Sequence, residues 1–285
     1  MARLDTEYGA GIVQASHSAL LELAVALGPY REALVLVGGW VPYLLLRRHG
    51  RPGTGFEHVG SIDIDLVVNP DRIGDREYSS LVELLHERAW KPSPQSRFSF
   101  RKGVPSPADG RTYDIQVDFL TPEPQDEGRK HRHRGIQPDF QARTMAGAPL
   151  VIAHNTPVDL SGALPSGARH AADLRMADVV GCVGTKGLIL GGKRGRYKEK
   201  DAYDVWAVLE HYGEGPREVA AAVRPHLREP LLGEAILRMR EWFSSETAPG
   251  PMAVADFFTA EEAEARKRRI TRAFAVVATF LEALE

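Results

Sequence analysis

Alternating apolar and polar stretches divide the first half of the chain into short strands and helices. Two apolar runs have the length of strands and lie at residues 33–37 and 62–68. Three segments carry apolar positions at helical spacing: 12–27, 40–48 and 75–89. We expect further strands at 98–101, at 113–120 and, once or twice, within 148–160, with a polar and basic stretch over 122–143. This order predicts a mixed α/β domain.

The second half of the chain has the pattern of a helical domain. The spacing of apolar residues predicts helices over 173–190, 199–212, 216–226, 230–243 and 260–284. The small and polar residues between 165 and 172 mark the expected boundary. We therefore predict an α/β domain at 1–168 and a helical domain at 169–285.

Composition narrows the class of protein. The chain of 285 residues is 43% hydrophobic and 26% charged, which is typical of a globular protein. A net charge of −2 argues against a protein that coats nucleic acid by bulk charge. The single cysteine, Cys182, excludes an intramolecular disulfide. The sequence contains neither a signal-peptide pattern nor a membrane-length apolar run, so we expect a cytoplasmic protein without membrane contact.

Asp63 and Asp65 are the first candidates for chemistry. They lie two residues apart in Gly-Ser-Ile-Asp-Ile-Asp-Leu-Val-Val, and a strand directs both carboxylates to one face. Two carboxylates on an apolar strand repel each other, and a divalent cation such as Mg²⁺ relieves that repulsion. The alternative is a strand whose polar face meets solvent.

Two further segments add to this interpretation. The turn Gly38-Gly39 follows an apolar strand and precedes a helix, so its backbone can approach a phosphate closely. In the segment Tyr113–Leu120, Asp114, Gln116 and Asp118 share one face, and Asp118, or else Asp114, can supply a third carboxylate. Three carboxylates around metal ions suit in-line phosphoryl transfer.

A second cluster of candidates lies in the helical half. Lys186 stands within an apolar helix, where an unpaired ammonium is unfavourable. A glycine-rich basic turn follows at 191–198 and leads into a helix on which Lys200 and Asp204 face the same way. Such a turn suits a triphosphate or an RNA phosphate. Segment 47–55 is another basic stretch, either a solvated loop or a contact for substrate phosphates. The basic segments 129–134 and 266–269 are either solvated surface or RNA contacts.

Gly38-Gly39, Gly60-Ser61-x-Asp63-x-Asp65 and a strand with Asp118 together resemble the nucleotidyltransferase superfamily with a polymerase-β-like core. The resemblance implies a mixed sheet, an active site in a cleft between core and helical domain, and Mg²⁺ or Mn²⁺ bound by Asp63, Asp65 and Asp118. Gly38, Gly39 and Ser61 would hold the triphosphate of an NTP substrate.

The second cluster is similar to the AbiEii/MenT branch of this superfamily, the toxin components of abortive-infection and toxin–antitoxin systems. The resemblance assigns Lys186 to the triphosphate, and Asp201 or else Asp204 to the late aspartate that acts as a base or organises the site. Lys198 and Lys200 are further candidates for nucleotide contact. An RNA acceptor, such as a tRNA 3′ end, and an antitoxin partner are implied as well. Unlike this chain, most members carry an arginine in the first motif.

Two rival functions share the core. An aminoglycoside-type nucleotidyltransferase would need an acidic acceptor pocket, whereas the basic stretches 129–134 and 193–200 favour RNA. A non-catalytic nucleotide-binding protein would bind an NTP without turnover.

Overall fold

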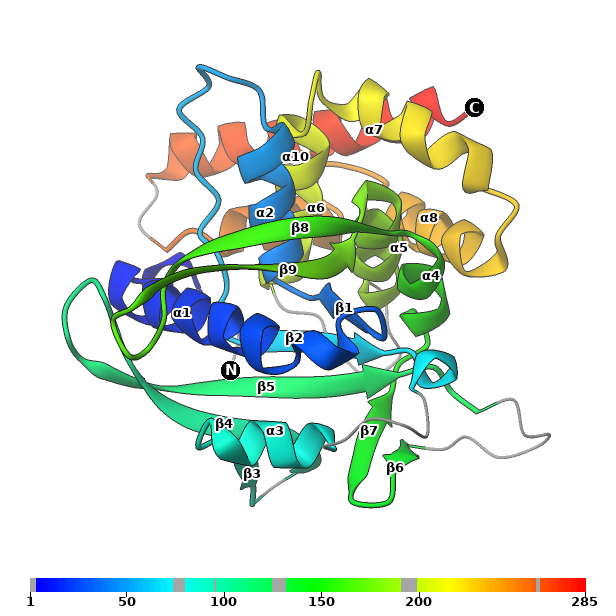
Figure 1. The fold of residues 1–285 in the computed structure, drawn as a ribbon. Helices are drawn as coiled ribbons and strands as arrows, with labels where there is room; N and C mark the ends of the chain where they lie inside the picture. Colours follow the sequence, from blue (N-terminus) through cyan, green and yellow to red (C-terminus); the bar gives the residue numbers. More distant parts are fainter. Residues whose placement is uncertain (1–3, 74–79, 95, 125–131, 191–198, 260–261) are drawn as a thin grey trace. The chain divides into compact units, whose positions relative to one another are not determined.

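The structure is a computed structural model that describes residues 4–73, 80–94, 96–124, 132–190, 199–259 and 262–285. The described residues form two compact units. The sheet unit comprises residues 9–40 and 61–177, and the helical unit comprises residues up to Tyr8, 41–60 and 178–285 (Figure 1). The chain therefore passes from one unit to the other several times.

The nine strands found among the described residues all belong to the sheet unit: β1 (Leu34–Val37), β2 (Ile64–Val68), β3 (Lys91–Ser93), β4 (Ser96–Pro105), β5 (Thr112–Thr121), β6 (His133–Gln137), β7 (Phe140–Thr144), β8 (Asn155–Ala163) and β9 (Arg169–Ala177). They form one mixed sheet in the order β3-β4-β5-β2-β1-β9-β8, and β7, which carries β6 on its other side, also pairs with β5. The pairs β1–β9, β2–β5 and β5–β7 are parallel, and the other pairs are antiparallel.

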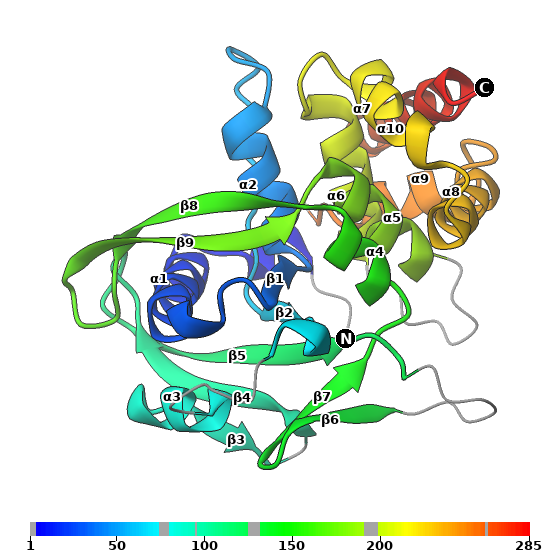
Figure 2. The same cartoon turned by 45° about the vertical axis from the view of Figure 1, so that its right-hand side comes forward.

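Three helices pack on this sheet: α1 (Ala10–Ala26), α3 (Leu81–Glu87) and α4 (Ala148–Ala153). Helix α1 lies against β4, β5, β8 and β9, and α4 contacts β1, β2 and β9 (Figure 2). Helix α3 begins with a capping box, because the Ser80 hydroxyl accepts the amide of Glu83 while the Glu83 carboxylate accepts the amide of Ser80.

The helical unit contains most of α2 (Trp40–His49) and six further helices: α5 (Val179–Ile189), α6 (Glu199–His211), α7 (Pro216–Val223), α8 (Pro230–Trp242), α9 (Pro249–Asp256) and α10 (Ala263–Ala283). Helix α5 packs against α6 and α8, and α10 packs against α7 and α9. The core includes Tyr203, whose ring stacks on Phe257. Among the described helices, none has the length and apolar content needed to cross a membrane.

The prediction of a mixed α/β fold is confirmed, but several predicted elements were wrong. Residues 169–177 form β9 rather than the start of a helix, since they pair with both β8 and β1. Residues 148–153 form α4 rather than a strand, and the polar stretch 122–143 contains β6 and most of β7. The expected domain boundary lay near 168, whereas the compact units separate after Ala177, and residues 41–60 group with the helices.

Candidate active site

Asp65 and Asp118, two of the predicted metal ligands, lie in register on neighbouring strands of the sheet unit. They are partners in the parallel ladder between β2 and β5, so their side chains leave the same face of the sheet. Both are half-buried. Gln116 donates a hydrogen bond of 2.7 Å to Asp118 Oδ1. Asp63 is also half-buried and directly precedes β2. The fold thus brings together two carboxylates that lie far apart in the sequence.

The carboxylate of Asp65 lies against the predicted glycine turn. Gly38 has a φ of +74°, and a Cβ at this position would lie 2.2 Å from Asp65 Oδ2. Any side chain larger than that of glycine at residue 38 would therefore strain the backbone and displace the Asp65 carboxylate. Gly39 is in the same turn between β1 and α2. Ser61 is buried, and its hydroxyl donates to the carbonyl oxygen of Asp63 at 3.0 Å. The turn and the acidic strand therefore form one compact arrangement.

Asp114 and Asp118 were alternative candidates for the third ligand, and their surroundings differ. Asp114 is exposed and accepts a hydrogen bond of 2.8 Å from the Arg101 guanidinium. It precedes the β2–β5 ladder, which extends from Val117 to Leu120 on β5. Asp118 lies within the ladder beside Asp65. The geometry favours Asp118 over Asp114 as the partner of Asp65.

The residues of the second cluster form a buried ionic network in the helical unit. Lys186 on α5 pairs with Asp201 Oδ1 at 2.8 Å and with Asp204 Oδ2 at 2.7 Å. Lys200 pairs with Asp204 Oδ1, and its ammonium lies 5.4 Å from the ring centre of Tyr8. Asp204 is fully buried, whereas the Asp201 side chain retains 14% exposure. Asp204 therefore organises the network, and Asp201 lies at its edge.

His58 is a member of this network that the sequence analysis missed. Its Nε2 lies 2.9 Å from Asp204 Oδ1, and its Nδ1 accepts the Gly60 amide at 3.1 Å. Because Nδ1 is an acceptor, Nε2 carries the proton and donates to Asp204. The partners are 146 residues apart. A histidine next to a glycine–serine turn was the only local signal.

Burial and neighbouring charge set the protonation states. Burial, together with the Lys200 ammonium, lowers the pKa of His58 from 6.5 to about 4, so the ring is neutral at pH 7. Burial also acts to raise the pKa of Asp204, but Lys186 and Lys200 outweigh it and the pKa is lowered. Burial acts to lower the pKa of Lys186, but Asp201 and Asp204 outweigh it and raise the pKa. The network therefore holds two paired carboxylates and a charged Lys186.

Lys200 and Lys198 are the remaining predicted nucleotide contacts, and the structure describes only Lys200. Burial lowers the pKa of Lys200, and its ammonium is occupied by Asp204. Lys198 lies outside the residues that the structure describes, as do 125–131 and the rest of the basic turn 191–198. The described members of the predicted site thus fall into two groups. Gly38, Gly39, Ser61 and the three aspartates belong to the sheet unit, and Lys186, Lys200, Asp201 and Asp204 belong to the helical unit.

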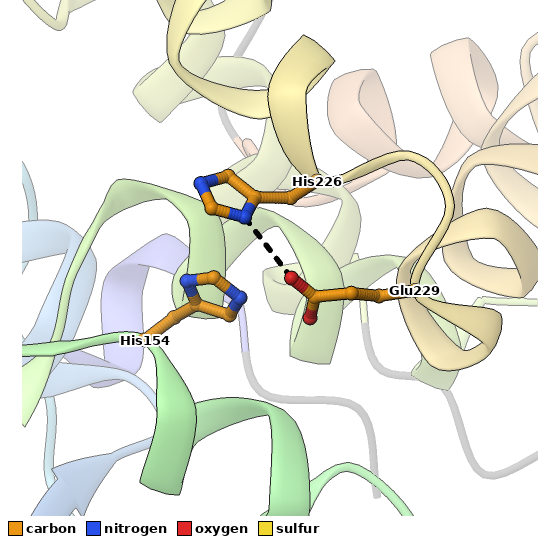
Figure 3. Close-up of side chains that lie close together, drawn as sticks. All are labelled: His154, His226 and Glu229. Atoms are coloured by element: carbon orange, nitrogen blue, oxygen red, sulfur yellow. Dashed lines mark hydrogen bonds and ion pairs between the residues drawn. The ribbon is translucent and has the colours of Figure 1, made fainter.

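Another pair of titratable side chains in the helical unit is a surface ion pair. His226 Nδ1 lies 3.0 Å from Glu229 Oε1 at the start of α8, and both side chains are more than a third exposed (Figure 3). His154, also labelled there, is the buried C-cap residue of α4 in the sheet unit. We assign no chemistry to the exposed pair.

A mixed sheet with in-register carboxylates beside a left-handed glycine is consistent with a nucleotidyltransferase core. One protein family, described as "Nucleotidyl transferase AbiEii toxin, Type IV TA system", matches residues 19–283. The chain belongs to this family, and is thus a nucleotidyltransferase toxin of a type IV toxin–antitoxin system. Searches of curated proteins and of solved structures found no match.

Proposed function

We propose that this protein transfers a nucleotide monophosphate from an NTP to a hydroxyl of an RNA acceptor, with the 3′ end of a tRNA as the preferred candidate. The observation that carries the proposal is the pairing of Asp65 with Asp118 beside Gly38. In-register carboxylates directed to one face can bind a cation together, and a left-handed glycine allows close approach of a phosphate.

The residues in the sheet unit suit a hard divalent cation. Asp63, Asp65 and Asp118 offer carboxylate oxygens, which are the donors that Mg²⁺ and Mn²⁺ prefer. When bound, such an ion would neutralise phosphate charge and help to align the reacting oxygens. The glycine turn excludes side chains from the space beside Asp65. These features support the assignment of Asp63, Asp65 and Asp118 as ligands.

The other residues are assigned to the substrate. Gly38, Gly39 and Ser61 would bind the triphosphate through backbone amides and a hydroxyl. The charged ammonium of Lys186 would pair with the triphosphate. Attack of the acceptor hydroxyl forms a new oxygen–phosphorus bond at the α-phosphate and breaks the bond to the β-phosphate, so that pyrophosphate leaves. Asp201, which lies at the partly exposed edge of its network, would take the hydroxyl proton.

The proposal is tested by incubation with Mg²⁺, each α-labelled NTP in turn and total bacterial RNA. We expect one NTP to label an RNA of tRNA size. Asp65→Asn and Asp118→Asn should each reduce labelling at least about a hundredfold, since both lose a charged ligand. Asp114→Asn is the matched control on the same strand and should keep wild-type activity, because Asp114 is paired with Arg101.

Two results would contradict the proposal. Full activity in Asp65→Asn would exclude the metal role of this residue. Absence of label with every NTP would exclude RNA as acceptor, and the same reaction with an aminoglycoside would then test the small-molecule alternative. An antitoxin partner is implied by the type of system, and co-expression of that antitoxin should relieve growth arrest.

A further inference from the structure

Arg143 on β7 lies on the same face of the sheet as the acidic pair. Asp118 and Leu120 are two residues apart on β5 and therefore share a face. Leu120 is the register partner of Arg143, so the Arg143 side chain leaves this face as well. Strand geometry places the Cα atoms of Asp118 and Arg143 about 8 Å apart. A guanidinium thus lies within reach of whatever binds beside the carboxylates.

The described contact of the Arg143 guanidinium is with an aromatic ring. Its guanidinium lies 5.1 Å from the ring centre of Phe98 on β4, and the Phe98 ring lies 5.4 Å from that of His133 on β6. Among the residues that the structure describes, no carboxylate pairs with Arg143. Phe98 and Arg143 are half-buried, and His133 is exposed. The three side chains therefore form a partly exposed surface of one cation and two rings.

The charge around this surface is positive. The segment 132–144, which spans β6 and β7, contains three arginines, Arg132, Arg134 and Arg143. Its one acidic residue is Asp139, whose carboxylate accepts a hydrogen bond of 2.8 Å from the Ser80 hydroxyl. Arg97 on β4 is exposed beside Phe98. Within this segment an anionic ligand would meet more positive than negative charge.

We propose that Phe98, His133 and Arg143 form a surface that binds the single-stranded end of the RNA acceptor. The inference rests on the proposed function and names the acceptor contact of that site. Arginines that pair with phosphates and rings on which bases stack are the two elements of single-strand recognition. A free NTP offers the same phosphate chemistry, so the test must separate the two ligands.

The first measurement is the binding of a fluorescein-labelled tRNA, by anisotropy, without any NTP. Arg143→Gln should weaken binding about tenfold at low salt and reduce the slope of log Kd against log salt by about 1. Arg143→Lys keeps the charge but loses the planar guanidinium. Compared with wild type, its salt slope should be nearly unchanged, whereas its affinity for tRNA should still be reduced. Phe98→Leu should weaken binding about tenfold with the slope unchanged.

Arg101→Gln is the matched control. Arg101 is an exposed arginine of β4, and its guanidinium is held by Asp114 and Gln116. It should bind tRNA as the wild type does. Equal losses in Arg101→Gln and Arg143→Gln would overturn the proposal, because they would show a general charge effect. Melting temperatures of all variants establish that each is folded.

The second measurement is the kinetics of transfer. In Arg143→Gln the KM for RNA should rise about tenfold, whereas the KM for the NTP should stay within about twofold of wild type. A rise in the KM for the NTP alone would overturn the proposal and assign Arg143 to the nucleotide. If the wild-type protein binds tRNA through these residues but transfers no nucleotide, the proposed function is refuted and the proposed RNA-binding surface is supported. A wild-type protein that transfers nucleotide to RNA, with tRNA binding unchanged in Arg143→Gln and Phe98→Leu, would refute the surface alone.

Discussion

The backbone conformation of a single residue, Gly38, helps to determine where the Asp65 carboxylate lies. Its φ of +74° favours glycine, and its Cα lies against the Asp65 carboxylate. We expect Gly38→Ala to lower the free energy of unfolding by about 1–2 kcal/mol through its left-handed backbone. The methyl group would also displace Asp65, so nucleotidyl transfer should fall at least about a hundredfold in the labelling assay.

Gly110 provides the control for this substitution. It has a similar φ of +69°, but a Cβ there would meet nothing within 4 Å. Gly110→Ala should therefore lose similar stability in a urea titration while transfer activity is kept. If both variants keep activity, the position of Asp65 does not depend on Gly38.

His58 makes stability depend on pH. Its pKa is about 4 in the folded protein and about 6.5 when unfolded, so the unfolded state binds more protons between these values. The stabilising contribution is fully present above pH 6.5 and is lost as the pH falls towards 4. The loss amounts to about 3 kcal/mol once His58 is protonated. Urea titrations from pH 7.5 to 4.5 measure it.

His58→Gln is the variant that isolates this contribution. The glutamine amide can still donate to Asp204 but does not titrate. His49 and His211, whose pKa values burial also lowers, remain in both proteins and cancel in the comparison. Between pH 6.5 and 4.5 the variant should lose less stability than the wild type. Parallel curves would mean that His58 is not the buried neutral group that its contacts indicate.

At the scale of elements, local patterns predicted those strands and helices whose apolar spacing is regular, such as β1, β2 and α6. The helix predicted from residue 173 failed because Leu174 and Met176 alternate with polar residues and pair with two strands. Such pairing overrides local preference and is not visible in a single sequence. For the same reason the sequence did not indicate a role for His58, because its partner on α6 is distant in sequence. The carboxylates of the sheet were predictable because each lies within a regular strand pattern.

The start of α5 gives a prediction at this scale. Asp178 caps the helix, since its carboxylate accepts the amides of Val180 and Gly181 at 2.9 Å each. Asp178→Ala should lower the free energy of unfolding by about 1 kcal/mol in a urea titration. Asp178→Asn retains an acceptor and should lose much less. If the two variants are equally destabilised, the charge rather than the cap matters at this position.

At the scale of the whole molecule, the chain passes from the helical unit to the sheet unit between Gly60 and Ser61. His58 and Gly60 belong to the buried network, whereas Ser61, Asp63 and Asp65 open the acidic strand. Ser61, Asp63 and Asp65 thus follow directly after a segment that the network holds in place. Because a bound ligand stabilises the folded state by mass action, nucleotide binding can be measured on the intact protein without turnover.

We expect a non-hydrolysable analogue of the transferred NTP, at about 100 times its Kd and with Mg²⁺, to stabilise the protein by about 2.7 kcal/mol. In a chain of 285 residues this corresponds to a rise in Tm of about 5–10 °C. The shift should need both analogue and Mg²⁺, since the carboxylates repel the phosphates when no cation is bound. Asp65→Asn should abolish most of it, whereas Asp114→Asn should keep it. An equal shift in the presence of EDTA would show that the nucleotide binds without the acidic strand, and the assignment of Asp63, Asp65 and Asp118 would then fall.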